Sequence, residues 1–204
     1  MKQLLIQLAS NLIIPVLGFW IWDWSLYFIL LFYVLDIISG DIVHFLKVKR
    51  IRKEDVSKSQ VIVKQYAVIS VLLTILILTS VQIGMKIYEP QLNIVDEIWN
   101  FLTYTELGVA QGIVLIPLIG FMAYSKYRME FEMLQLYKVQ QERPLWKHHL
   151  KEQFLLLSFI AILTLIAAGY HLNEWIVLVI ILVVSTGYNY LQGKERIKNR
   201  YLIP

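Results

Sequence analysis

Residues 24–53 read WSLYFILLFYVLDIISGDIVHFLKVKRIRK, an apolar run followed at once by five lysines and arginines. The hydrocarbon core of a bilayer is about 30 Å thick, which a helix of about 20 apolar residues crosses. Positive charges collect on the cytoplasmic side of such spans. The stretch therefore predicts a transmembrane helix over residues 24–46 whose second end faces the cytoplasm.

Blocks of this kind recur along the whole chain, and 58% of the 204 residues are hydrophobic. Soluble domains are nearer 45–50% apolar. The pattern predicts an all-α fold, a polytopic transmembrane helical bundle that forms a single membrane domain over residues 1–204. The first block has no small-residue cleavage site and is interpreted as a retained span. The six predicted spans cover residues 4–22, 24–46, 61–87, 107–124, 154–170 and 175–191.

The distribution of positive charge predicts the orientation. With these six spans, eighteen of the nineteen lysines and arginines fall on one side and only Lys86 on the other. The positive side faces the cytoplasm, so both termini are expected there, in a bacterial inner membrane. The net charge of +4 is attributed to topology and contact with anionic lipid headgroups, and no nucleic acid is expected as a partner.

Two connections are longer than turns. Residues 91–103 carry apolar side chains at helical spacing and predict a short helix lying in the outer interface. Residues 125–142 continue the apolar stripe of the fourth span and predict a cytoplasmic helical extension that ends before Pro144. Five of the six tryptophans fall at the predicted outer interface and Trp146 at the inner one, the layer that tryptophan prefers.

The second predicted span contains ionisable side chains. Asp36 lies near its midpoint, with Asp41 and His44 nearer the cytoplasm. A charge in mid-bilayer costs about 2.5–3.5 kcal/mol on insertion scales, so such residues usually face the bundle interior. Asp36 and Asp41 point about 140° apart on the helix, whereas Asp41 and His44 share a face. A proton or cation relay and a structural role in helix packing both remain open.

Other spans supply polar partners for these side chains. Ser70 and Thr74 lie one helical turn apart in the third span, and proline and glycine residues interrupt several others. Together they predict a bundle with a polar seam that serves packing more often than function. The further intramembrane polar candidates are Asn11, Gln111 and Asn189.

Catalytic signatures are absent from the sequence. There is no cysteine, nucleophile elbow, phosphate-binding glycine loop or H-E-x-x-H motif. His148 and His149 are neighbours in a basic segment, so an interfacial, lipid-facing role is expected for them. No catalytic residue, metal site or cofactor is predicted.

The motifs Asn11-x-x-x-Pro15-x-x-Gly18 and Tyr33-x-x-Asp36 resemble an uncharacterised family of small bacterial multi-pass membrane proteins, a domain of unknown function. That family favours glutamate where Asp36 stands and two histidines where this chain has Thr103 and Gln111. The resemblance implies the six-span architecture and supplies no activity.

The leading hypothesis is therefore a non-enzymatic accessory or interaction subunit of a membrane assembly, with a protein partner or a homo-oligomer. The alternative is a small oligomeric channel or transporter that uses Asp36. An intramembrane enzyme using Asp36 with His44 is disfavoured, because eight residues of helix separate the two by about 12 Å.

Overall fold

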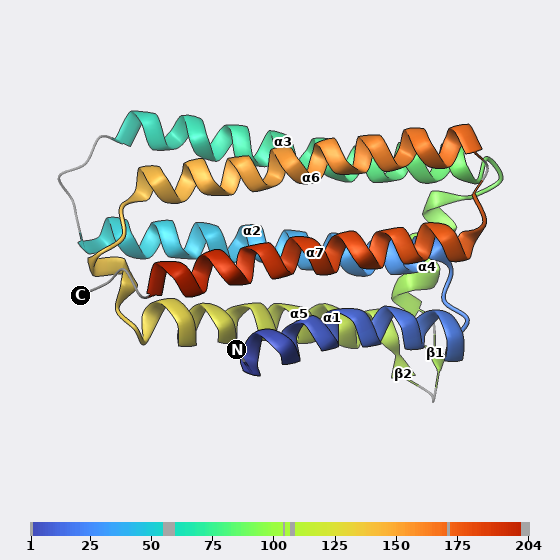
Figure 1. The fold of residues 1–204 in the computed structure, drawn as a ribbon, viewed down its shortest axis with the longest axis horizontal. Helices are drawn as coiled ribbons and strands as arrows, with labels where there is room; N and C mark the ends of the chain where they lie inside the picture. The colour runs from blue at the N-terminus through green and yellow to red at the C-terminus, as the bar shows by residue number, and fades with distance from the viewer. Residues whose placement is uncertain (1, 55–59, 104, 107–108, 171, 201–204) are drawn as a thin grey trace. The chain divides into compact units, whose positions relative to one another are not determined.

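The computed structural model describes residues 2–54, 60–103, 105–106, 109–170 and 172–200. These residues are almost entirely helical, which confirms the predicted all-α class (Figure 1). The elements in chain order are α1 (Lys2–Ile21), α2 (Leu26–Glu54), α3 (Gln60–Tyr88), α4 (Ile94–Thr103), β1 (Thr105–Glu106), β2 (Val109–Ala110), α5 (Gln111–Tyr127), the π-helical turn η1 (Arg128–Glu132), the 3-10 turn η2 (Leu136–Lys138), α6 (Glu142–Tyr170) and α7 (Glu174–Arg200).

The predicted spans coincide with long helices, but the helix ends differ. α2, α6 and α7 continue well beyond the predicted spans at the ends that carry the positive charge. Charged side chains do not interrupt a helix, so hydropathy marks the apolar part alone. α5 begins at Gln111 and not at residue 107, because Val109–Ala110 pairs antiparallel with Thr105–Glu106.

Three helices are long and apolar enough to cross a membrane, within the part of the chain that the structure describes. These stretches are Leu26–Lys53, Lys64–Tyr88 and Glu142–Ile166, in α2, α3 and α6. α1 and α7 contain shorter apolar stretches, Leu12–Ile21 and Glu174–Gly187.

The chain divides into two compact units, and the first comprises Met1–Ile29 and Tyr170–Pro204. Within it α1 packs against α7. The ring of Phe19 meets that of Trp175 edge-on at 4.6 Å. After α1 the chain reverses at Asp23, which adopts a left-handed φ of 52°. The Gly18 carbonyl accepts the backbone N–H of Trp24 at 3.0 Å and closes this turn.

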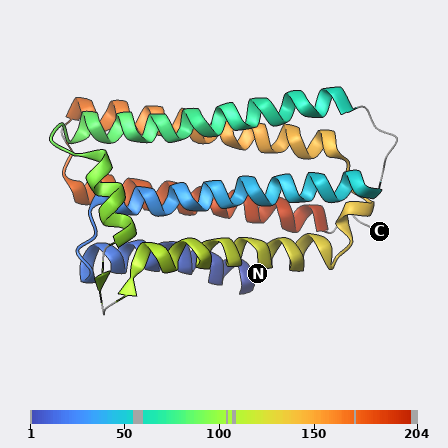
Figure 2. The same cartoon turned by 180° about the vertical axis from the view of Figure 1, so that it is seen from behind.

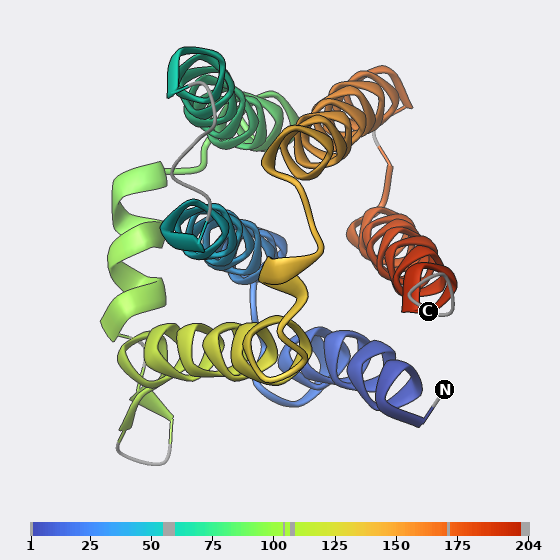
Figure 3. The ribbon, with the colours of Figure 1, turned by 90° about the vertical axis from the view of Figure 1, so that its left-hand side faces the viewer.

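The second unit, Leu30–Gly169, contains most of α2 together with α3 to α6. Figures 1 and 3 show α3 and α6 running alongside each other, with α2 beside them. α4 lies across the long helices between the end of α3 and the start of α5 (Figure 2). The short helix predicted over 91–103 is present from Ile94 to Thr103. Phe101 is buried, whereas Val95 and Trp99 are 73% and 65% exposed.

The segment 125–142 differs from the predicted continuous extension. α5 ends at Tyr127, and the chain then passes through η1 and η2 before α6 begins at Glu142. Gln135 interrupts the helical path with a left-handed φ of 52°. Pro144 lies inside the first turn of α6, a position that tolerates proline because its missing N–H has no helical partner there.

Packing against α2 explains why this segment folds back. Tyr127 and Phe131 are buried with Ile51 of α2 in one apolar cluster. The Arg50 guanidinium lies 4.4 Å from the centre of the Tyr137 ring. Such cation–π contacts contribute about 0.5–2 kcal/mol. The apolar stripe that predicted a projecting helix therefore covers the end of α2.

Candidate functional site

A buried polar cluster joins α2, α3 and α6 within the second unit. Asp41 comes from α2, Thr74 from α3 and Gln153 from α6. Asp41 is 8% exposed and Gln153 is 4% exposed. The Thr74 hydroxyl donates to Asp41 Oδ2 at 2.5 Å. The cluster thus ties three helices together at one carboxylate.

The Gln153 amide nitrogen lies at the centre of the cluster. Nε2 is 2.9 Å from Thr74 Oγ1 and 3.2 and 3.4 Å from the two Asp41 oxygens. The Ser70 carbonyl oxygen is also 3.4 Å away. Four oxygen atoms therefore surround a nitrogen that carries only two hydrogens.

Two stacked imidazoles border the carboxylate. His149 Nε2 of α6 lies 3.1 Å from Asp41 Oδ1, close enough for a charge contact but not aligned as a hydrogen bond. The His149 ring stacks on the His44 ring with centres 3.9 Å apart and planes 10° apart. The two rings therefore pack face to face beside Asp41.

Trp146 closes the cluster on the side of the stacked histidines. Its ring is 1% exposed and meets the His44 ring edge-on at 4.5 Å. It packs with Val48 of α2 and is flanked by Phe45 and Tyr66. Trp146 is therefore a packing anchor between helices, and its position at the inner interface stays a prediction.

The ends of α2 and α6 are joined by an ion pair. Arg52 Nε donates to Glu142 Oε1 at 2.9 Å. Glu142 stands in the first turn of α6, where a negative charge also interacts favourably with the helix dipole. This contact fixes the end of α6 that carries His149 and Gln153.

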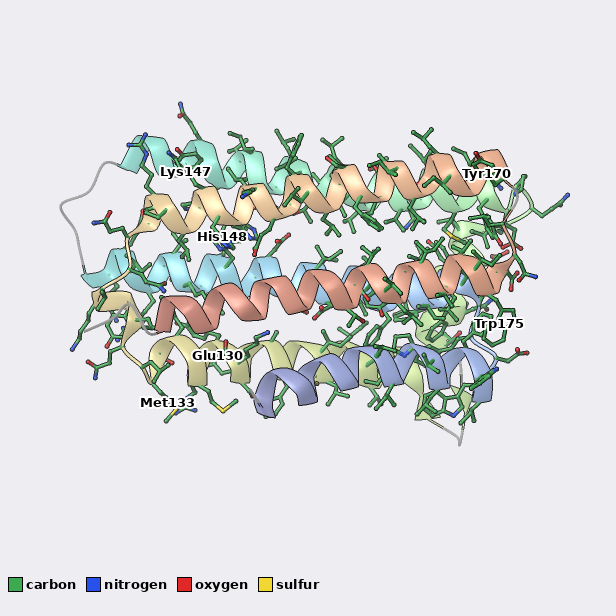
Figure 4. All side chains as sticks on the ribbon, in the orientation of Figure 1. Glu130, Met133, Lys147, His148, Tyr170 and Trp175 are labelled. Atoms are coloured by element: carbon green, nitrogen blue, oxygen red, sulfur yellow. The ribbon has the colours of Figure 1, made fainter. Side chains whose placement is uncertain are left out.

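His148 and His149 have different environments despite being neighbours. His148 is exposed, and its Nδ1 lies 3.2 Å from Glu152 one turn along the helix. Figure 4 places His148 and Lys147 at the N-terminal end of α6, with Tyr170 at the other end. The lipid-facing position expected for both histidines therefore does not hold for His149, which turns toward Asp41.

The structure separates the predicted site residues. Asp41 and His44 belong to the cluster, but the described partners of Asp41 come from α3 and α6 and not from His44. Asp36 is exposed and lies outside the cluster. Three candidates lie in α1, α5 and α7, with side chains outside the described part of the structure: Asn11, Gln111 and Asn189.

The sequence analysis did not predict that Gln153 and His149 would contact Asp41, or that Trp146 would be buried beside them. The predicted fifth span began at residue 154, so these residues were assigned to a cytoplasmic loop. The spacing of His149 and Gln153, one helical turn apart, was the available signal. Extending the span backward to Glu142 would have put both on one helix face.

Comparison with known proteins adds no identification, since no family model, curated protein or solved structure matches the chain. The cluster therefore has to be interpreted from its own chemistry. It can hold three helices in register, and it can hold positive charge beside a buried carboxylate.

Proposed function

We propose that this chain is a six-span inner-membrane protein with both termini in the cytoplasm, acting as a non-enzymatic accessory or interaction subunit. The three long apolar helices and the shorter apolar stretches of α1 and α7 support the membrane assignment. The charge asymmetry supports the orientation, because a different number of spans would place lysines and arginines on both sides.

Reporter fusions test the orientation. A reporter active only in the cytoplasm should be active after Glu54 and Arg143, and inactive after Asn93 and Asn173. A periplasmic reporter should give the reverse pattern at the same four positions. Periplasmic activity at Glu54 would overturn the proposed orientation.

The exposed apolar faces of α3 and α6 support the proposal that this chain is an interaction subunit. In the most apolar 18-residue stretch of each helix, only 22% of α3 and 11% of α6 is buried inside the chain. In a bilayer such faces meet lipid or another membrane protein, and helices associate there through close packing. The exposed apolar side chains of α3 include Val68, Ile69, Val71, Leu72, Ile75, Leu76, Ile83 and Ile87.

Purification from native membranes in a gentle detergent, followed by mass spectrometry of the bound proteins, tests this proposal. We expect a partner membrane protein in stoichiometric amount. Introducing a polar residue on the exposed face, as in Leu72→Gln, should release the partner. The matched substitution Leu134→Gln, in the turn between η1 and η2, should not. Retention of the partner by Leu72→Gln would place the interface elsewhere.

The exposure of Asp36 favours one alternative, a small oligomeric channel or transporter. This carboxyl lies midway along the apolar part of α2 and is exposed, so it would line a path formed between copies of the chain. A homo-oligomer without other partners would support this function. Asp36→Asn should then abolish ion flux without loss of folding, and unchanged flux would exclude it.

A further inference from the structure

We infer that the cluster of Asp41, Ser70, Thr74 and Gln153 is a binding site for one hard monovalent cation, Na⁺ or K⁺. Four oxygen atoms from α2 and α3 converge on the position that Gln153 Nε2 holds. An amide N–H₂ group carries a partial positive charge and satisfies two acceptors at most. The Thr74 hydroxyl supplies a third hydrogen, to Asp41 Oδ2, and the four oxygens still offer more lone pairs than three hydrogens occupy.

The other atom of the same amide is the second observation. Gln153 Oε1 is buried and has no hydrogen-bond partner among the described residues. A buried acceptor without a partner costs about 1–3 kcal/mol. Rotation of the amide about its last torsion exchanges Nε2 and Oε1. The cluster would then present five oxygens, and the N–H₂ group would take the place that now has no partner. A cation lying among the five oxygens offsets the cost of that unpartnered N–H₂ group.

The chemistry of the donors selects the class of cation. Carboxylate, hydroxyl, amide and backbone carbonyl oxygens are ligands of hard cations. The described residues contain no group of three or more His, Cys, Asp or Glu placed to hold a metal ion. Asp41 supplies one negative charge, which one monovalent ion balances, whereas a divalent ion would leave an uncompensated buried charge.

The neighbouring histidines are compatible with this ion. His149 Nε2 lies 3.1 Å from Asp41 Oδ1, beside the oxygens that would hold the ion. The Asp41 side chain keeps 12% of its surface exposed, which leaves an approach to the carboxylate.

Thermal unfolding of the full chain in a nonionic detergent tests the inference, with tryptophan fluorescence as the signal. Choline chloride is compared with NaCl and KCl at constant ionic strength. We expect a saturable rise in Tm with Na⁺ or K⁺, about 5–10 °C at one hundred times Kd. Equilibrium binding of ²²Na⁺, or of ⁸⁶Rb⁺ as the K⁺ substitute, should give one ion per chain and distinguish the two cations.

Variants separate this site from general salt effects. Asp41→Asn should lose both the Tm rise and the bound ion. Gln153→Met should weaken binding at least tenfold. The second variant tests the site even if Asp41→Asn does not fold. Asp96→Asn, which removes an exposed carboxylate of α4 outside the cluster, should behave like the original chain. Equal Tm values in all three salts, or an undiminished rise in Asp41→Asn, would overturn the inference.

Discussion

Replacing Trp146 by alanine is expected to lower the free energy of unfolding by about 3–5 kcal/mol, the range for removing a buried large aromatic side chain. Trp146 has one of the largest fully buried side chains in the described residues. It contacts α2 through Val48 and α3 through Tyr66. The loss arises from the van der Waals contacts of both interfaces, which hold helices together inside a bilayer as well as in water.

Unfolding in mixed micelles of increasing denaturing-detergent content measures this effect. Trp146→Phe should cost much less, because the indole Nε1 has no hydrogen-bond partner among the described residues and only ring area is lost. Trp99→Ala is the matched control: that ring is 65% exposed, so its removal should change stability by no more than about 0.5 kcal/mol. Equal losses for Trp146→Ala and Trp99→Ala would contradict the packing described for α6.

The second large effect is expected at Gly18, which the sequence pattern placed in the motif with Asn11 and Pro15. A Cβ atom at this position would lie 2.2 Å from Cε3 and 2.5 Å from Cδ2 of Trp24. The indole cannot move aside easily, since it is 4% exposed and its ring centre lies 4.4 Å from that of Phe28. Gly18→Ala is therefore expected to destabilise the first unit by about 1–3 kcal/mol or more.

Alanine substitutions at two other glycines should give smaller changes in stability in the same unfolding assay. At Gly84 an added Cβ would meet the Thr164 hydroxyl oxygen at 2.6 Å, which a change of side-chain rotamer relieves, so the loss should be smaller. At Gly40 nothing lies within 4 Å, and alanine should stabilise α2 by up to about 1 kcal/mol through its higher helix propensity. A destabilisation at Gly40 equal to that at Gly18 would show that the clash with Trp24 is not the cause.

The sequence predicted some features of the helices and not others. The positions of the apolar helices followed from hydropathy because the length of an apolar run is a local property of the chain. The ends of α2 and α6 did not, since charged residues continue a helix as readily as apolar ones. The extension over 125–142 was predicted as one helix because its apolar stripe has helical spacing, whereas the stripe packs against Ile51.

The candidate site divides in the same way. Asp41 and His44 stood out as ionisable residues in an apolar span, and Ser70 and Thr74 as a polar pair one turn apart. Asp36 is also an ionisable residue in the same apolar span, but it lies outside the cluster. Gln153 is an ordinary polar residue at a helix end until the fold brings it to Asp41.

The sequence by itself determined the helical class, the positions of the apolar segments and the clustering of positive charge beside them, because each is set by residues close together in the chain. The tertiary structure alone decided which polar side chains meet. Asp41 is 33 residues from Thr74 and 112 from Gln153, and no local pattern relates positions so far apart. Those contacts exist because α2, α3 and α6 bury their facing sides together, and polar groups buried there must find partners in one another.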